Sequence, residues 1–198
     1  MKKERVCAVF SSIPTLRTER LILRRMSVRD VDDMFDYASR ESVTEYLLWE
    51  PHQSKRYTED YLRYISTRYN LGDFYDWAVV EAQSGRMIGT CGFTRFDLPN
   101  NSAEIGYVLN PDFHGNGYAT EAAAKVMEFG FCELGLHRVE AKFMQGNAAS
   151  LHVMEKLGMT FEGYRRDGML VKHKYRTIGV CSILASEWAE WAEKENYE

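Results

Sequence analysis

The sequence has little of several features that would place it in a special class of protein. Only four of its 198 residues are proline and 14 are glycine, which excludes collagen-like repeats and low-complexity disorder. Its four cysteines occur singly, without a CxxC pair or a histidine at zinc-ligand spacing: Cys7, Cys91, Cys132 and Cys181. We therefore expect free thiols in a reducing, cytoplasmic setting, and neither a disulfide framework nor a metal site.

Excess positive charge and long apolar runs are also missing. The 25 lysines and arginines stand against 29 acidic residues, for a formal net charge of −4. Because nucleic-acid binding requires a basic surface, we expect no direct nucleic-acid partner. The apolar run at residues 6–10 is too short for a signal peptide or a membrane span, which predicts no membrane partner.

The chain does contain an ordered series of helix and strand patterns, typical of one mixed α/β (α+β) domain around a single core. Apolar spacing predicts helices after Ser27 and over residues 58–69, 118–134 and 150–157. Alternation predicts strands at residues 21–24, 77–81, 87–93, 103–109, 138–144, 159–166 and 175–186. Short connections make the three successive strands between residues 77 and 109 antiparallel.

A glycine-bearing loop precedes the helix predicted at residues 118–134. Its segment His114-Gly115-Asn116-Gly117 runs directly into that helix, whose first amide N–H groups and positive dipole end suit an anion. A purely structural turn remains the alternative. Walker A and dinucleotide-binding loops are excluded, because position 120 is threonine and no GK[ST] follows.

The run HGNGYATEA at residues 114–122 resembles the Gln/Arg-x-x-Gly-x-Gly/Ala acetyl-CoA loop of the GNAT superfamily, in the form found in its RimJ/RimL branch. Further segments that match this branch, in the same order, are TERLILR at 18–24, AEIGY at 103–107, NAAS at 147–150, MEKLGM at 154–159 and ILASEW at 183–188. The resemblance spans about residues 15–190, so we assign 1–14 to an N-terminal tail, 15–190 to the domain and 191–198 to a C-terminal tail. It implies a GNAT fold, with a mostly antiparallel sheet of about seven strands flanked by helices.

The same resemblance implies acetyl-CoA as co-substrate and no metal. Backbone amides of residues 115–120 would hold the diphosphate, and the strand at 107–109 would pair with the pantetheine arm like an added strand. In this family that strand parts from its neighbour, which leaves donors for the thioester carbonyl. The expected cofactor-binding residues are Tyr107, Val108, Leu109, His114, Gly115, Asn116, Gly117, Tyr118, Ala119, Thr120, Asn147 and Lys156.

Two of these residues also suit a purely structural role, and the sequence departs from the branch at four positions. Asn147 fits a plain turn residue, and Lys156 fits a solvated helix lysine. His114 replaces the usual Gln or Arg and Met159 replaces an aromatic residue, whereas Thr177 and Cys181 stand where the branch often has Asp and Tyr. The last two changes concern the acceptor end of the site.

Two residues match catalytic positions of the family. Glu104 matches the general base, which acts directly or through water, and a solvated strand carboxylate is the alternative. Ser150 matches a serine thought to protonate the leaving thiolate, and its position also suits a helix N-cap. Trp49, His52 and Trp77 are candidates for lining the acceptor pocket, although aromatic residues at such positions are more often core.

We therefore predict an N-acetyltransferase that moves an acetyl group from the CoA thioester to a primary amine by direct attack. An N-terminal α-amine of a protein or peptide is the favoured acceptor, because its pKa of about 8 demands less of the base than a lysine at about 10.4. The alternatives are a small amine (a polyamine, amino acid or antibiotic) and a non-catalytic CoA-binding module. We expect a monomer or homodimer, and an acidic wall where a cationic amine binds.

Overall fold

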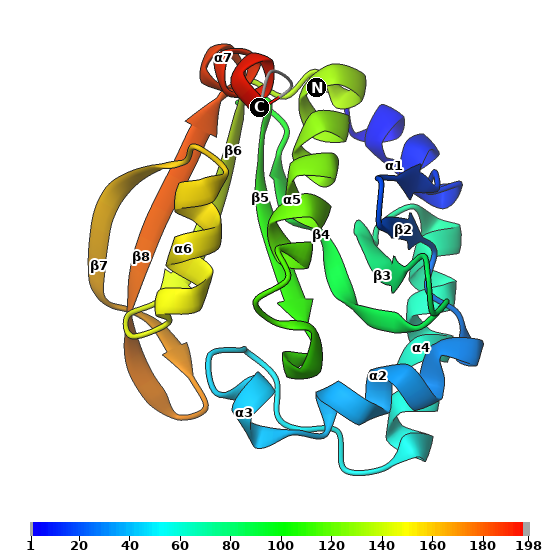
Figure 1. Ribbon diagram of the computed structural model, residues 1–198. Helices are drawn as coiled ribbons and strands as arrows, with labels where there is room; N and C mark the ends of the chain where they lie inside the picture. Colours follow the sequence, from blue (N-terminus) through cyan, green and yellow to red (C-terminus); the bar gives the residue numbers. More distant parts are fainter. Residues whose placement is uncertain (1, 196–198) are drawn as a thin grey trace.

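A single eight-stranded sheet forms the centre of the computed structural model, which describes residues 2–195 (Figure 1). The strand order is β1-β2-β3-β4-β5-β6-β8-β7, and only β5 and β6 pair in parallel. The strands are β1 (Leu16–Arg17), β2 (Leu21–Arg24), β3 (Asp76–Glu81), β4 (Met87–Asp97), β5 (Ser102–Leu109), β6 (Arg138–Met144), β7 (Thr160–Val171) and β8 (Lys174–Leu184). The mostly antiparallel α/β sheet is confirmed. It has eight strands, not seven, because β1 pairs with β2.

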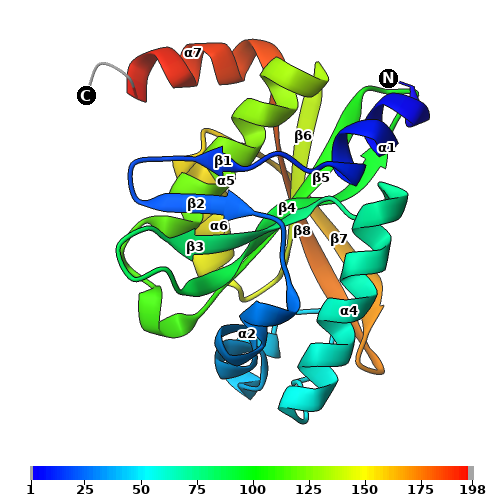
Figure 2. The ribbon, with the colours of Figure 1, turned by 90° about the vertical axis from the view of Figure 1, so that its right-hand side faces the viewer.

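Helices cover both faces of the sheet. Helices α2 and α4 pack on one face, and α5 and α6 lie on the other (Figures 1 and 2). The helices are α1 (Lys3–Ser11), α2 (Val31–Ala38), α3 (Glu41–Thr44), α4 (Lys55–Leu71), α5 (Tyr118–Glu128), α6 (Ala148–Lys156) and α7 (Ala185–Glu195), and a π-helical turn, Phe129–Leu134, continues α5.

Local chemistry sets the ends of α4, the helix predicted at residues 58–69. The Ser54 side chain accepts a hydrogen bond from the Tyr57 amide, which starts the helix three residues earlier than predicted. Gly72 ends it with φ of 69°, a conformation that favours glycine. Between these caps the buried Leu62, Ile65 and Tyr69 recur at helical spacing and face the sheet.

Both expected tails contain helix. Residues 3–11 form α1, in which Val6 and Phe10, one helical turn apart, are buried in the core. The C-terminal segment from residue 191 begins inside α7, where Trp188 and Trp191 stack at 4.6 Å between ring centroids. Residues 196–198 lie outside the described residues.

Strands β5 and β6 pair over only half of their length. The register runs from Ser102 opposite Arg138 to Ile105 opposite Ala141, whereas β5 continues to Leu109 and β6 to Met144. Over residues 106–109 the β6-facing edge of β5 therefore has no strand partner within residues 2–195. This separation matches the one that the family resemblance implies.

Candidate active site

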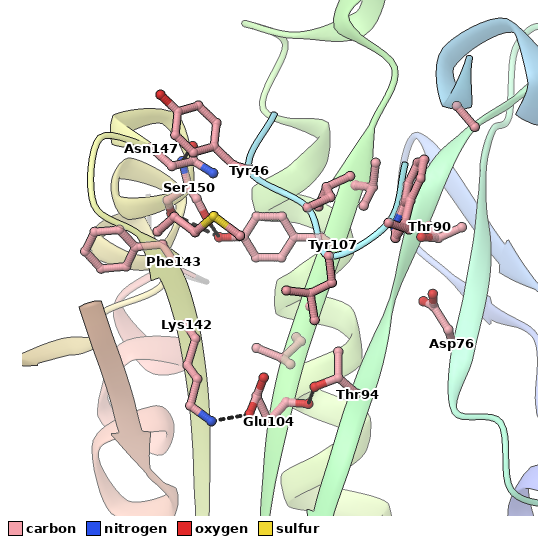
Figure 3. A pocket seen from close by; sticks show the side chains of 18 of the residues that line it. Tyr46, Asp76, Thr90, Thr94, Glu104, Tyr107, Lys142, Phe143, Asn147 and Ser150 are labelled. Carbon is pink, nitrogen blue, oxygen red and sulfur yellow. Dashed lines mark hydrogen bonds and ion pairs between the residues drawn. The ribbon is translucent and has the colours of Figure 1, made fainter. Parts of the chain in front are cut away.

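A cavity of about 410 Å³ lies on the α2 and α4 face of the sheet, beside the point where β5 and β6 part (Figure 3). A second groove, of about 550 Å³, follows the ends of β5, α5 and α6. Both are lined by Tyr46, Tyr107, Val108, Asn147 and Ser150. The two spaces therefore meet where the sheet is split.

The groove contains the glycine-bearing loop. Gly115 and Gly117 have φ of 79° and 78°, backbone angles that residues with a side chain adopt only with strain. The first backbone bond of α5 runs from the Glu121 amide to the Gly117 carbonyl, so the amides of residues 118–120 precede the helical bonding pattern. Every residue expected to bind the cofactor lines this groove except Asn116, which lies in the same loop.

Side chains hold this loop in place. The His114 Nε2 lies 3.1 Å from the Leu109 carbonyl oxygen, and the Asn116 amide donates to the Phe113 carbonyl. Arg20, directly before β2, donates to the Asn116 carbonyl at 3.0 Å and pairs with Glu121 on α5. Sequence reasoning missed this role of Arg20, although the residue lies in the TERLILR segment that carries part of the family resemblance.

The hydroxyl groups of Tyr107 and Ser150 meet where the two cavities join. The Tyr107 hydroxyl donates to the Ser150 carbonyl at 3.0 Å and lies 3.2 Å from Ser150 Oγ. Burial raises the pKa of Tyr107 above its ordinary value, although its bond to Ser150 opposes this; the phenol therefore stays protonated. The N-cap of α6 is Asn147, whose side chain accepts from the Ser150 amide at 3.1 Å, so the helix-cap role expected for Ser150 is wrong.

Glu104 lies on the cavity wall in an ion pair with Lys142 of β6, at 2.5 Å (Figure 3). Lys142 also pairs with Glu140 at 3.1 Å. Burial lowers the pKa of Lys142, but Glu104 and Glu140 outweigh it and leave that pKa above its ordinary value. Lys142 thus stays charged and compensates Glu104. Sequence reasoning missed Lys142, because the register of two parallel strands is not readable from either strand alone.

Two of the three predicted acceptor-lining residues reach the cavity. Trp49 and His52 line it beside tyrosines from α4. His52 Nδ1 lies 2.8 Å from Thr58 Oγ1, and burial lowers the pKa of His52, which keeps its ring neutral at pH 7. Trp77 does not reach it. Its side chain is fully buried on the opposite face, where Nε1 donates to the Pro14 carbonyl at 2.7 Å.

Side chains alternate along a strand, so Asp76, the neighbour of Trp77 in β3, points to the face of the sheet that borders the cavity. The Asp76 carboxylate lines the cavity, accepts from the Trp77 amide at 3.1 Å and is hydrogen-bonded by Thr90 (Figure 3). Burial raises the pKa of Asp76 to about 7. Sequence reasoning missed this residue, and the available signal was the strand alternation that places positions 76 and 77 on opposite faces.

Within residues 2–195, no helix has the length and apolar character needed to cross a membrane. In the same part of the chain no three His, Cys, Asp or Glu side chains are grouped so that they would hold a metal ion.

Comparisons with known proteins agree with this geometry. The family described as "Acetyltransferase (GNAT) domain" matches residues 20–160. An uncharacterised N-acetyltransferase of Bacillus licheniformis is 34% identical over 88% of this chain and 98% of its own length. The [ribosomal protein uS5]-alanine N-acetyltransferase of Escherichia coli is 24% identical over 90% and 95%. A GNAT-family acetyltransferase structure from Bacillus anthracis has a TM-score of 0.77 at 28% identity and covers 87% of this chain and 99% of its own.

Proposed function

The chain belongs to the GNAT family and is an N-acetyltransferase, and from that premise we propose that it transfers the acetyl group of acetyl-CoA to a primary amine. The observation that carries the proposal is the meeting of two cavities at the split between β5 and β6. One cavity presents backbone donors suited to a polyanion, and the other presents acidic and aromatic side chains suited to an amine.

The groove fits the co-substrate by the chemistry of its donors. Amides of residues 118–120, at the positive end of α5, would hold the diphosphate without lysine or arginine side chains. The free edge of β5 at residues 106–109 would hydrogen-bond the pantetheine arm as an added strand. When bound there, acetyl-CoA supplies the acetyl group as a thioester, whose carbonyl an amide of this edge would polarise.

The residues that would transfer protons lie beside the point where β5 and β6 separate. Glu104 would take the proton of the acceptor amine, directly or through a water molecule. Its charge is already balanced by Lys142, which makes it a weak base. Such a base suits an acceptor amine that loses its proton easily. The hydroxyls of Tyr107 and Ser150, which lie 3.2 Å apart where the two cavities meet, would give a proton to the leaving sulfur.

An N-terminal α-amine of a protein or peptide is the acceptor that we favour. Its pKa of about 8 leaves about a tenth of the amine neutral at pH 7, far more than for a lysine, which suits a weak base. The Escherichia coli relative is named for modification of an alanine on a ribosomal protein. A small amine is the second candidate. Lys172, at the β7–β8 turn, donates to the Thr44 carbonyl at 2.7 Å. This contact joins the turn to the end of α3, just before the cavity-lining Tyr46 and Leu47, and a cavity bounded in this way would favour a compact acceptor.

A panel of amines assayed by thiol release and product mass tests the proposal. An alanine-initiated peptide, the same peptide with a blocked N-terminus and an internal lysine, spermidine and free amino acids would be offered with acetyl-CoA. We expect the free α-amine peptide to be acetylated fastest. Acetyl-CoA binding by calorimetry without transfer to any amine would favour a non-catalytic CoA-binding module, and failure to bind acetyl-CoA by a folded chain would overturn the proposal.

A further inference from the structure

Two carboxylates line the proposed acceptor cavity, and they differ in what balances their charge. Glu104 is paired with Lys142, which Glu140 also contacts. Within residues 2–195, the Asp76 carboxylate has only the Trp77 amide and the Thr90 side chain as hydrogen-bond partners, and it makes no ion pair with a basic side chain. A carboxylate offers about four acceptor sites, so Asp76 keeps capacity for another donor.

We propose that Asp76 binds the amino group of the acceptor and makes the cavity selective for amines that enter as cations. This inference rests on the proposed function and deepens it, because it names the group that recognises the acceptor. Asp76 would be a binding residue that selects the cation, whereas Glu104 would receive the proton that the bound amine loses.

The sheet leaves a path between Asp76 and the reacting edge of β5. Asp76 is opposite Gly92, and Gly92 is opposite Gly106, so neither residue between Asp76 and the far edge of β5 carries a side chain in that row, and only the Thr94 methyl group reaches over Gly106. A Cβ on Gly92 would lie 2.8 Å from Asp76 Oδ1, which any side chain there would displace. With strands about 4.8 Å apart, two spacings of about 10 Å accommodate the carboxylate, its hydrogen bond and an amino group.

The groups that face Asp76 supply no positive charge. They are Tyr37 from α2, Tyr61 and Tyr69 from α4, and Thr90 from β4. Burial, followed by the charge of Asp76, raises the pKa of these tyrosines, so all three stay neutral at pH 7. An ionised carboxylate among neutral buried groups is destabilised, and an entering ammonium group would relieve that cost.

The aromatic walls complete a site for an amine. Tyr61, Tyr57 and Trp49 line the same cavity and surround the neutral His52. Aromatic faces attract an ammonium group, and they do so more strongly when water is excluded. A neutral alcohol of the same shape would gain neither the ion pair nor this attraction, so charge and not shape would decide what the cavity accepts.

The test is Asp76→Asn in the full chain, with an alanine-initiated peptide as acceptor. We expect the KM for the peptide to rise tenfold or more at pH 7.5, with a smaller change in kcat and an unchanged KM for acetyl-CoA. Asp60→Asn, an exposed change of the same charge on α4, is the control and should leave all three constants unaltered. A peptide KM within twofold of the original enzyme overturns the role of Asp76.

A ligand measurement keeps the test decisive if the variant folds poorly. The probes are that peptide and its analogue begun with lactic acid, in which a hydroxyl replaces the amino group. We expect the amine, and not the hydroxyl analogue, to raise the melting temperature of the original protein. Equal stabilisation by both overturns the inference while leaving the acetyltransferase proposal intact, whereas absence of thiol release from every amine defeats the proposed function itself.

Discussion

The groove on the α5 side and the cavity on the α4 side are built in different ways. The proposed anion site of the groove uses backbone groups from one continuous stretch, the loop from residue 110 to 117 and the first turn of α5. The cavity uses side chains from segments far apart in the chain, including Asp76 on β3, Glu104 on β5 and Lys142 on β6. A backbone site tolerates many side chains but depends on glycine, whereas a side-chain site can change its ligand by single substitutions.

The largest expected effect is on the stability of the folded chain, and it comes from Asp76 in the cavity. Because the pKa of Asp76 is raised to about 7 in the folded chain, its charge opposes folding. That cost is absent below the unfolded pKa of about 4, grows as the pH rises towards 7 and is complete above it. Asp76→Asn should therefore raise the free energy of unfolding at pH 8 by on the order of 3 kcal/mol, and by far less at pH 4. Urea titrations at both pH values measure this.

The control for that experiment is Asp60→Asn, which removes an exposed carboxylate from α4. Its unfolding free energy should differ from that of the original protein by less than about 0.5 kcal/mol at either pH. Equal stability of the Asp76→Asn variant and the original protein at pH 8 would mean that the ionised Asp76 carboxylate does not destabilise the folded chain. The cavity would then not differ from the groove in holding a destabilising charge.

The next largest effect should be on kcat, which a change in the cavity should lower without altering the groove. Glu104→Gln removes the proposed proton acceptor and should lower kcat by about a hundredfold, with acetyl-CoA affinity unchanged because Glu104 lines the cavity and not the groove. The pH dependence of kcat should also shift. Glu140→Gln is the matched control, since Glu140 contacts Lys142 but lies outside the cavity lining. An undiminished kcat in Glu104→Gln would exclude Glu104 from proton transfer.

The reciprocal change acts on the groove. Gly117 has φ of 78°, so Gly117→Ala should strain the backbone by about 1 kcal/mol and turn the amides of α5 away from the diphosphate. We expect acetyl-CoA to bind about tenfold more weakly, measured by calorimetry, with the KM for the amine unchanged. Gly135→Ala carries the same strain at φ of 72° in open space and should affect stability alone. Equal binding by both glycine variants would contradict a backbone-built anion site.

The same contrast explains what could be predicted from the sequence. The loop that lines the groove depends on glycine spacing and a helix start, which are local, so its position was predicted from the sequence, whereas the groove residues from the α3 segment, such as Tyr46 and Leu47, and the contribution of Arg20 were not. The cavity depends on register and alternation between distant strands. Placing Trp77 in it was wrong by one residue, because both faces of β3 are buried, so the hydrophobic pattern does not show which face turns Asp76 into the cavity. The pairing of Lys142 with Glu104 follows only from the parallel register of β5 and β6.

Helix α1 shows a related limit. A single turn of apolar spacing, Val6 and Phe10, is too short to distinguish a helix from a tail by periodicity alone. Its helix is stabilised by packing: Phe10 contacts Tyr75 at 4.9 Å and Trp77 at 5.6 Å between ring centroids. The start of α6 was also not determined by the sequence, because either Asn147 or Ser150 suits a helix N-cap by residue type. Only the observed hydrogen bond from the Ser150 amide to the Asn147 side chain decides between them.

The smallest expected effect lies at the junction, where neither region alone accounts for the site. Tyr107→Phe keeps the buried ring and removes the hydroxyl that contacts Ser150, and Ser150→Ala removes the other hydroxyl. If the pair delivers one proton to the leaving sulfur, each change should lower kcat by about fivefold, and the double variant should lose little more than either single variant, because groups that act as a unit are not additive. Steady-state kinetics with saturating acetyl-CoA measure this. Independent, multiplicative losses would show instead that the two hydroxyls serve different steps, one on each side of the split in the sheet.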